Sequence, residues 1–348
     1  MNSYRFIRYF LFKLPPETAH RLTLGLMQLA GATWPLNPLL RVIYTAPQKT
    51  VQAFGLQFSN PIGLAAGYDK DGLGWRGLAC LGFGHIEVGT VTPRPQPGNP
   101  QPRLFRLPEE HALINRMGFP GLGAEYVLQQ ISKPRQKGLV LGVNIGKNKD
   151  TALDRAVEDY LYLFRVFHSH ADYLVVNVSS PNTVGLRQLQ GRQELDRLLS
   201  QLSIERAQRS APGSRPIPIL VKLAPDLTDG ELDDALDVIF GNRMDGVIAT
   251  NTTIARNGLN SPLAVEAGGL SGQPLLGISL AMVAKIHTRT GGKLPIIGVG
   301  GIDDATGVQK MMDAGAVLVQ LYTGLVYHGP GLIGRILREL SHSPLAES

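Results

Sequence analysis

The sequence predicts an α/β fold, a (β/α)8 TIM barrel with an N-terminal amphipathic helical hairpin. Its 348 residues are enough for this barrel, which runs to about 250 residues as one domain. After residue 58 one pattern recurs eight times, with a short apolar run, a polar or glycine-rich end and a helical stretch. An open doubly wound sheet is the alternative, and it would normally carry a glycine-rich fingerprint on its first strand.

Residues 1–45 are predicted to form a helical extension that precedes the barrel domain of residues 46–348. The segment YRFIRYFLFKL at 4–14 has apolar residues at helical spacing, and two prolines separate it from a second helix that runs to about residue 30. At about 1.5 Å per residue the first helix reaches only roughly 16 Å, so we expect it to lie on a membrane rather than to cross one. A helix pair that merely packs on the barrel is the structural alternative.

Positive charge is concentrated at this end of the chain. Residues 1–50 contain six basic residues and one acidic residue, whereas the whole chain has a formal net charge of +6. A nucleic-acid groove would draw cations from several parts of a barrel, so we expect no nucleic acid as partner. A basic amphipathic end is typical of proteins that bind an anionic membrane surface.

Two further features bear on where the protein is found in the cell. The segment 4–14 lacks a cleavage site, and we find no transit peptide. The single cysteine, Cys80, suits a reducing compartment and is predicted to be a small buried residue. We therefore expect a monomeric, peripheral protein on the cytoplasmic side of a bacterial inner membrane.

The eight predicted strands end in residues that are useful for binding. The strands are NPIGLAAG from residue 60, HIEVGTV from 85, LVLGVNIG from 139, DYLVVNVS from 172, PILVKLA from 218, DGVIATNT from 245, LPIIGVGG from 294 and AVLVQLYTG from 316. Active sites in this fold lie at the carboxyl ends of the strands. Polar ends on nearly every strand therefore predict one lined pocket.

Two glycine loops and two insertions complete this predicted pocket. GVGGI at 298–302 and TGL at 323–325 offer backbone N–H groups for a phosphate, although glycines required only for tight turns are the alternative. The segments 92–119 and about 253–273 are longer than ordinary connectors. We expect both to form lids or binding walls over the pocket.

The chemistry of these residues favours a flavin over a metal. Lys222 could stabilise the anionic reduced flavin, and Lys70 could neutralise a substrate carboxylate. The close pair His168 and His170 has no third ligand at useful spacing, so no metal site is predicted. No G-x-S-x-G elbow accompanies Ser180, which argues against a hydrolase.

Nine motifs resemble the dihydroorotate dehydrogenase family, and the resemblance covers essentially the whole chain. They are AAGYDKDG at 65–72, GTVTPRPQPGNP at 89–100, INRMGF at 114–119, GVNIGKNKDT at 142–151, NVSSPNT at 177–183, VKLAPD at 221–226, ATNTT at 249–253, GGLSG at 268–272 and IIGVGGI at 296–302. The N-terminal hairpin, with PPETAHRLT around His20, further resembles the membrane-associated, quinone-dependent class 2 of that family.

The resemblance implies oxidation of (S)-dihydroorotate to orotate in de novo pyrimidine (UMP) biosynthesis, with FMN as cofactor and a ubiquinone, menaquinone or plastoquinone type of quinone as electron acceptor. It implies that FMN is held by Ala66, Gly67, Tyr68, Asp69, Lys70, Thr90, Asn144, Asn177, Lys222, Thr250, Gly272, Gly301, Tyr322 and Thr323. It implies that the substrate is held by Lys70, Asn115, Arg116, Met117, Gly118, Phe119, Asn177, Asn182, Asn251 and Thr252.

The resemblance also implies how protons and electrons move. Ser180 would be the base that removes the C5 proton while hydride leaves C6 for the flavin. Serine is a weak base in water, so the site must be closed, and Thr183 and Phe119 are the candidates for that enclosure. His20, Arg106 and Tyr322 match the polar positions of a quinone tunnel between the N-terminal helices and the flavin.

Two other functions remain open at this point. A flavin barrel that acts on tRNA would fit the sequence pI of 9.4, but we would expect a catalytic cysteine and an added RNA-binding domain. A barrel that binds flavin without catalysing a reaction is the second alternative.

Overall fold

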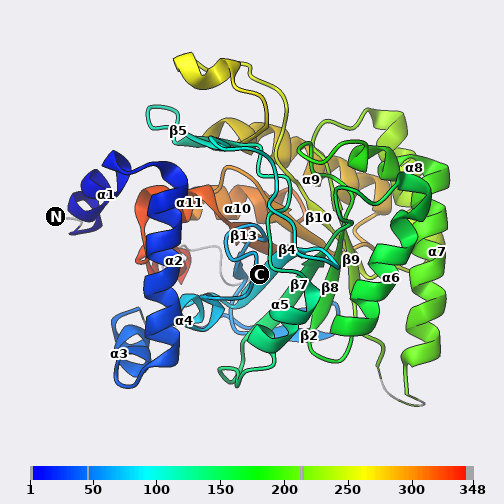
Figure 1. Cartoon of the computed structure of the whole chain (residues 1–348), viewed down its shortest axis with the longest axis horizontal. Helices are drawn as coiled ribbons and strands as arrows, with labels where there is room; N and C mark the ends of the chain where they lie inside the picture. The colour runs from blue at the N-terminus through cyan, green and yellow to red at the C-terminus, as the bar shows by residue number, and fades with distance from the viewer. Residues whose placement is uncertain (1–2, 45–46, 212, 214, 342–348) are drawn as a thin grey trace.

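The computed structural model describes residues 3–44, 47–211, 213 and 215–341 (Figure 1). Eight parallel strands close into a barrel in the order β10–β12–β13–β3–β4–β7–β8–β9, so chain neighbours are also spatial neighbours. The strands are β3 (Ile62–Leu64), β4 (His85–Val91), β7 (Val140–Ile145), β8 (Tyr173–Asn177), β9 (Ile219–Leu223), β10 (Gly246–Ala249), β12 (Ile296–Val299) and β13 (Leu318–Leu321). Each lies within one predicted strand, and the predicted barrel is confirmed.

Helices cover the outside of this barrel. They are α4 (Trp75–Ala79), α5 (Ala124–Ile131), α6 (Ala156–Phe167), α7 (Arg192–Arg209), α8 (Asp229–Gly241), α9 (Leu276–Thr290), α10 (Ala305–Asp313), α11 (Thr323–His328) and α12 (Leu332–Ser341). Short 3-10 turns are found at Leu153–Arg155, Leu186–Gln190, Pro262–Val265 and Gln273–Leu275. Helix α8 begins with a capping box, in which Thr228 accepts from the Glu231 N–H and Glu231 accepts from the Thr228 N–H.

The strands are buried on both faces, which explains their continuous apolar runs. In β8, Tyr173 and Val175 pack inside the barrel, whereas Leu174 and Val176 pack against the surrounding helices. Burial of each aliphatic side chain contributes about 1.5–3 kcal/mol. Because side chains alternate along a strand, Asn177 continues the inward row of β8 at the carboxyl end of the barrel.

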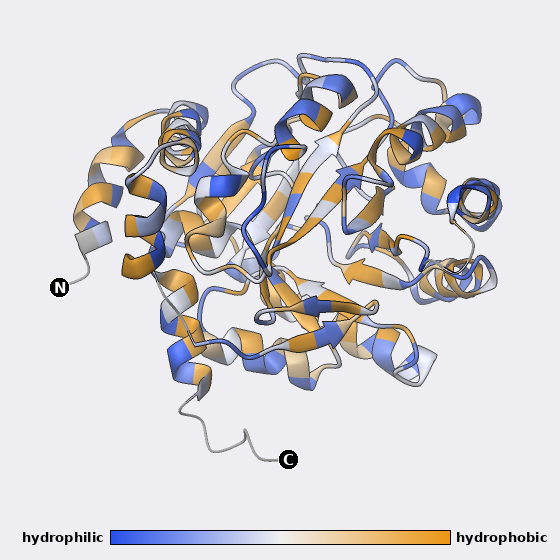
Figure 2. Ribbon diagram, turned by 90° about the horizontal axis from the view of Figure 1, so that it is seen from below, coloured by the Kyte–Doolittle hydropathy of each residue, from blue (hydrophilic) through white to orange (hydrophobic). Residues whose placement is uncertain are grey.

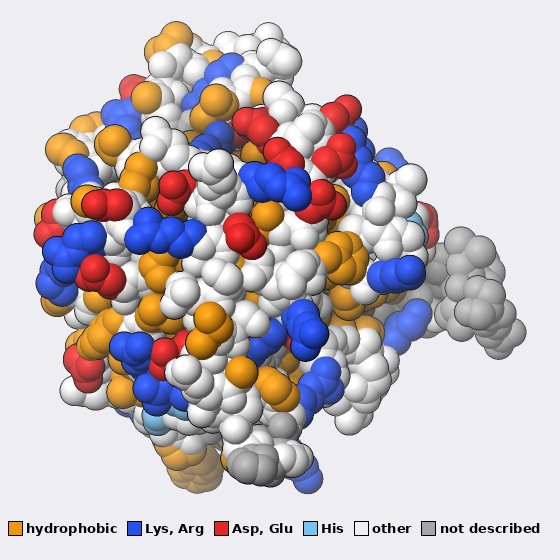
Figure 3. Space-filling view, turned by 90° about the vertical axis from the view of Figure 1, so that its right-hand side faces the viewer, with side chains coloured by type: hydrophobic (Ala, Val, Ile, Leu, Met, Phe, Trp, Pro, Cys, Tyr) orange, Lys and Arg blue, Asp and Glu red, His pale blue; other side chains and the backbone are white. Residues whose placement is uncertain are grey.

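The outer helices on the right-hand side of Figure 1 carry charges of both signs, which lie side by side in Figure 3. Arg192 pairs with Asp234 at 2.6 Å, which links α7 to α8. Arg165 pairs with Glu205 at 2.8 Å, which links α6 to α7. This face is therefore a solvated surface of mixed charge.

Three helices precede the barrel: α1 (Ser3–Lys13), α2 (Pro16–Ala32) and α3 (Leu36–Ile43). The first two are the predicted hairpin, and their hydrophobic residues are orange in Figure 2. No third helix was named in the prediction, although α3 lies within residues 1–45, which were predicted as a helical extension. No helix within the described ranges is long and apolar enough to cross a membrane.

Helix α2 packs closely on α4 of the barrel. A Cβ at Gly77 would lie 2.0 Å from the Met27 carbonyl oxygen, so only glycine permits this crossing. Leu24 of α2 belongs to the main core. The N-terminal helices are therefore joined to the barrel on one side while much of their apolar surface stays exposed.

The two long insertions contain strands, which the sequence did not indicate. Strands β5 (Leu104–Leu107) and β6 (Ala112–Asn115) form a hairpin, and β11 (Gly269–Gly272) of the second insertion pairs with β6. A further hairpin, β1 (Val51–Ala53) and β2 (Leu56–Phe58), precedes the barrel and packs Phe54 and Phe58 into its interior cluster. The insertions form a small sheet rather than separate loops because each supplies the other with hydrogen bonds.

Candidate active site

One cavity opens at the carboxyl ends of the barrel strands, and most of the predicted site residues line it. These are Ala66, Gly67, Lys70, Thr90, Asn115, Met117, Gly118, Phe119, Asn177, Ser180, Asn182, Lys222, Thr250, Asn251, Thr252, Gly272, Gly301, Tyr322 and Thr323. The alternation of side chains explains part of this convergence. Lys222 and Thr250 follow the inward-facing Leu220 and Ile248 by two residues, as Asn177 follows Val175.

Neutral hydrogen-bonding groups form the floor of this cavity. The Asn177 amide donates to Thr90 Oγ1 at 2.8 Å and to Asn144 Oδ1 at 3.1 Å. Thr90 in turn donates to Asn144 Oδ1 at 2.5 Å. Asn144 does not line the cavity, but it fixes the two residues that do. Satisfied buried networks of this kind hold side chains in one orientation.

A buried carboxylate, Glu87, supports this floor from below. It accepts from the Asn144 amide at 2.7 Å and from the Gln320 amide at 2.7 Å, and it is fully buried. Burial lowers the pKa of Lys222, and the charge of Glu87 opposes that shift. Sequence reasoning missed Glu87 and Gln320, although a charged residue inside the apolar run HIEVGTV was a usable signal.

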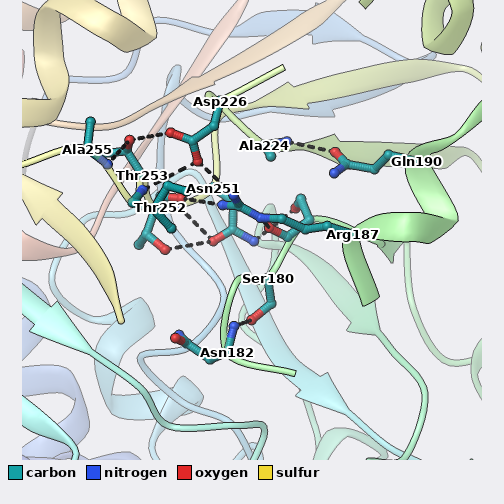
Figure 4. A network of polar contacts seen from close by, with 12 residues as sticks. Ser180, Asn182, Arg187, Gln190, Ala224, Asp226, Asn251, Thr252, Thr253 and Ala255 are labelled. Atoms are coloured by element: carbon teal, nitrogen blue, oxygen red, sulfur yellow. Dashed lines mark hydrogen bonds and ion pairs between the residues drawn. The ribbon is translucent and has the colours of Figure 1, made fainter. Parts of the chain in front are cut away.

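The loop that carries Ser180 is held by an ion pair that sequence reasoning also missed (Figure 4). Arg187 pairs with Asp226 at 2.8 Å and donates to the carbonyl oxygens of Ser179 at 3.0 Å and Thr252 at 3.1 Å. These contacts join the ends of β8, β9 and β10. Ser180 is itself buried, and its Oγ accepts from the Asn182 N–H at 3.3 Å.

Lys70 and three asparagines surround the mouth of the cavity. Burial lowers the pKa of Lys70 to about 8, and its Nζ donates to the Gly67 carbonyl at 2.6 Å. Asn182 donates to Asn115 Oδ1 at 3.0 Å, while Asn251 donates to Ser179 Oγ at 2.9 Å. The mouth thus combines one cation with several neutral amides, which suits a planar anionic ligand.

Glycines line the opposite end of the cavity, where a phosphate was predicted. A Cβ at Gly301 would lie 2.5 Å from the Leu276 backbone nitrogen, and its φ of +75° also favours glycine. Thr323 lies beside it in the cavity wall, with its Oγ1 2.9 Å from Ser271 Oγ. Backbone atoms therefore form the cavity wall at Gly301, so an anion could come close to the backbone N–H groups.

A second, mostly apolar cavity lies between the N-terminal helices and the barrel. Its wall consists of Tyr4, Leu11, Phe12, Pro16, Ala19, His20, Thr23, Tyr68, Leu104, Arg106, Leu113, Tyr322 and Val326. Tyr322 lines both cavities. The rings of His20 and Tyr68 meet edge to face at 5.1 Å, and those of Tyr68 and Tyr322 do so at 5.5 Å. We call this second cavity the tunnel.

Comparison with known proteins identifies the family. Residues 49–343 match the family model described as dihydroorotate dehydrogenase. The chain belongs to the dihydroorotate dehydrogenase family. It is 47% identical over 341 residues to a Coxiella burnetii protein and 48% identical over 331 residues to one from Cellvibrio japonicus, both named dihydroorotate dehydrogenase (quinone). These alignments cover 98% and 95% of this chain and 97% and 96% of the relatives.

Solved structures of the dihydroorotate dehydrogenase from Eimeria tenella have the same fold. The ferulenol complex matches with a TM-score of 0.87 at 38% identity, covering 96% of this chain and 93% of that one. The ligand-free structure matches with a TM-score of 0.85 at 39% identity, covering 93% and 94%. The resemblance to the quinone-dependent class is confirmed, and the chain is an oxidoreductase of this flavin-dependent family.

Besides Asn144, three residues expected at the dihydroorotate dehydrogenase site are absent from the wall of the barrel cavity. Tyr68, expected to hold the cofactor, forms part of the tunnel wall. Asp69 accepts from the Leu73 and Gly74 N–H groups at 2.8 Å, and burial raises its pKa to about 6. Arg116, expected to hold the substrate, pairs instead with Glu266 at 2.5 Å. Asp69 and Arg116 therefore fix loops, because their charges are already paired or capped.

His20, Arg106 and Tyr322, the residues predicted to line a quinone tunnel, all line the second cavity. Burial, together with the charge of Lys70, lowers the pKa of His20 to about 4, so the ring is neutral near pH 7. Arg106 donates to the carbonyls of Leu11 and Leu14, and its guanidinium stacks 4.7 Å from the Phe12 ring. Arg106 thus anchors the β5–β6 hairpin to α1.

Other residues that the sequence singled out lie outside both cavities. His168 and His170 follow the end of α6, where His168 Nδ1 lies 3.0 Å from the Arg165 carbonyl oxygen. Cys80 is buried at the end of α4. Sequence reasoning missed a different cluster, in which His328 and Gln273 contact Asp303 at 3.1 and 2.8 Å. His111, at the tip of the β5–β6 hairpin, lies 3.9 Å from the same carboxylate.

Proposed function

We propose that this chain oxidises (S)-dihydroorotate to orotate in pyrimidine biosynthesis, with FMN in the barrel cavity and a membrane quinone as electron acceptor in the tunnel. The observation that carries the proposal is the pair of cavities that meet at Tyr322, one lined by many hydrogen-bonding side chains and the other mostly apolar. The relatives named dihydroorotate dehydrogenase (quinone) support the same reaction.

The cavity has polar atoms that suit a flavin. Lys222 Nζ lines the cavity and has no hydrogen-bond partner among the residues that the structure describes. Gln320 Oε1 is buried in the same wall and likewise lacks a partner there. Lys222 would hold the negative charge of the reduced ring, and the glycine wall around Gly301 would hold the phosphate. When bound, FMN accepts hydride from the substrate and supplies electrons to the quinone.

The mouth of the cavity would bind and orient dihydroorotate. The Lys70 ammonium would pair with the substrate carboxylate. Asn115, Asn182 and Asn251 would form hydrogen bonds with the ring amides, because an amide group donates and accepts without adding charge. Phe119 covers the site and is almost fully buried, so it would exclude water when the substrate is bound.

Ser180 would remove the proton from substrate C5. As Ser180 Oγ takes the C5 proton, its own hydroxyl proton would pass to Thr183 or to water. The Asn182 N–H that donates to Ser180 Oγ favours the partial negative charge on this oxygen during the transfer. Thr183 Oγ1 is buried without a hydrogen-bond partner in the described chain, so it is available to relay the proton onward. The ion pair of Arg187 and Asp226 would keep this loop against the substrate.

The N-terminal helices would place the tunnel at a membrane surface. Phe6, Ile7 and Phe10 of α1 are more than half exposed, as are Leu26 and Leu29 of α2. Exposed apolar side chains on helices that also carry a basic excess are typical of peripheral membrane proteins. We propose a monomeric protein on the cytoplasmic side of a bacterial inner membrane.

An absorbance spectrum of the pure protein before and after anaerobic dihydroorotate tests this function. We expect a flavin spectrum that bleaches with the substrate and returns with a quinone. A yellow protein that never bleaches would instead be a flavin-binding barrel without this activity. A tRNA-modifying flavoenzyme is disfavoured because Cys80 is buried outside the cavity wall.

A further inference from the structure

A third cavity, of about 300 Å³, lies where α3, the end of α2 and α4 meet the segment before β7. It shares no lining residue with the barrel cavity or the tunnel. In Figure 1, α3 lies at the opposite end of α2 from α1. We call this third cavity the α3 pocket.

The wall of the α3 pocket is basic. Arg41, Arg76 and Arg135 line it, and none of the described residues in its lining is an aspartate or glutamate. Arg135 is already paired with Asp172 at 2.6 Å. The Arg76 guanidinium makes no hydrogen bond or ion pair with any residue that the structure describes, and it is only partly exposed. A guanidinium in this setting suits a phosphate, which it binds through two parallel hydrogen bonds.

The same wall also offers an acceptor. Gln136 Oε1 is buried without a hydrogen-bond partner in the described part of the chain. A buried carbonyl oxygen of this kind is costly unless a donor reaches it. A ligand that carries a phosphate together with a hydroxyl or ammonium group would satisfy both Arg76 and Gln136.

Apolar surface lies directly beside the α3 pocket. Helix α3 buries none of its side chains, and Leu39, Val42 and Ile43 are 52%, 75% and 58% exposed. Trp34, in the pocket wall, is 86% exposed. Tryptophan with this exposure is typical of the interface between a membrane and water. A free phosphate would leave this apolar surface in water, whereas a lipid would cover it.

We propose that the α3 pocket binds the headgroup of an anionic phospholipid, with Arg76 on the phosphate and the acyl chains along α3. This inference rests on the membrane association in the proposed function and adds a specific lipid class to it. Contacts through α1 and α3 at the two ends of α2 would hold the tunnel at a set orientation to the bilayer.

Intrinsic fluorescence reports on this pocket directly, because both tryptophans of the chain, Trp34 and Trp75, line it. We would titrate the full-length holoprotein with dihexanoyl phosphatidylglycerol below its micelle concentration, and in parallel with dihexanoyl phosphatidylcholine and inorganic phosphate. We expect a saturable change with the phosphatidylglycerol at concentrations at least tenfold below those of the other two probes. An equal response to inorganic phosphate, or no saturable response, would overturn the proposal.

Substitutions then assign the response to the pocket. Arg76→Gln should weaken the phosphatidylglycerol response at least tenfold, and Arg76→Lys should restore part of it. Arg21→Gln, which removes a more exposed charge from α2 outside the pocket, should leave it unchanged. Equal losses in Arg76→Gln and Arg21→Gln would mean general charge attraction and would overturn the proposal. Flavin content and melting temperature show that each variant is folded.

Vesicles separate this proposal from the proposed function. On vesicles that contain phosphatidylglycerol, Arg21→Gln should lose about fivefold in binding, as for one charge near an anionic surface, and Arg76→Gln should lose more. Dihydroorotate oxidation with a water-soluble quinone should be unchanged in Arg76→Gln. If the variant bound such vesicles as well as the wild type did, the lipid pocket would be wrong while the oxidation reaction stood. Failure of the oxidation itself would count against the proposed function alone.

Discussion

The barrel cavity and the tunnel share Tyr322, but the residues that line them differ in chemical character. The barrel cavity is built from strand ends whose amides and hydroxyls are fixed by hydrogen bonds, such as those among Thr90, Asn144 and Asn177. The tunnel is built mainly from aromatic and aliphatic side chains of helices and a hairpin added outside the barrel. The difference teaches that this fold can place a cavity rich in hydrogen-bonding groups and a mostly apolar cavity on the two sides of one side chain.

The two cavities also differ in their ionisable side chains and in the contacts that these side chains make. Lys70 and Lys222 line the barrel cavity, and burial lowers the pKa of both amino groups. In the tunnel, burial lowers the pKa of His20 to about 4, and Arg106 is held by backbone carbonyls. Two lysine side chains thus line the barrel cavity. The tunnel is lined instead by the neutral imidazole of His20 and by the Arg106 guanidinium, which already donates hydrogen bonds to backbone carbonyls.

The largest expected effect concerns the barrel cavity alone. Ser180→Ala should retain flavin and lower the rate of flavin reduction by dihydroorotate about 10²- to 10⁴-fold, the usual contribution of a general base. Rapid-mixing absorbance under anaerobic conditions measures this step. Ser180→Cys, which keeps a proton acceptor, is the matched control and should recover part of the rate. Normal reduction in Ser180→Ala would remove Ser180 from the mechanism.

The next effect should be confined to the tunnel. Ala19 lines it, so Ala19→Phe should fill the space and slow reoxidation by a long-chain quinone roughly 10- to 100-fold, the cost of overpacking at a binding site. Flavin reduction by dihydroorotate should stay normal. Thr18→Phe places the same ring on the exposed face of α2 and serves as control. If both half-reactions slowed equally, the separation of the two cavities would be wrong.

The pH dependence of kcat/KM for dihydroorotate tests the role of the Lys70 charge in the barrel cavity. Lys70 is charged below its pKa of about 8 and neutral above it. Because only the ammonium pairs with the substrate carboxylate, kcat/KM for dihydroorotate should fall about tenfold per pH unit above pH 8. Lys70→Arg keeps its charge over this range and should lose that alkaline limb. An identical limb in both proteins would assign it to another group.

The smallest effect should come from the support of the Ser180 loop. Arg187→Leu removes the ion pair with Asp226 and two bonds to carbonyl oxygens. We expect kcat to fall about fivefold, since a loosened loop places the base less accurately. Steady-state assays at saturating dihydroorotate measure this change. Arg187→Lys should retain more activity than Arg187→Leu, and full activity in both would show that the loop needs no such support.

The sequence by itself determined the barrel and most of the residues around its mouth. Each strand is a continuous apolar run with a polar end, and the closed parallel topology brings those ends to one place. Alternation of side chains then decides that Asn177, Lys222 and Thr250 point inward. These features are local, and so they can be read from the order of residues alone.

Only the tertiary structure decided which charges are free and which are already paired. Arg116 and Asp69 occupy expected positions in the motifs, yet each is held by a partner that lies on another segment or on the next turn. Glu87 supports the cavity floor because closure of the barrel places its carboxylate where it accepts hydrogen bonds from the Asn144 and Gln320 amides. The pairing of Arg116 and the position of Glu87 depend on contacts between distant segments, which no local pattern records.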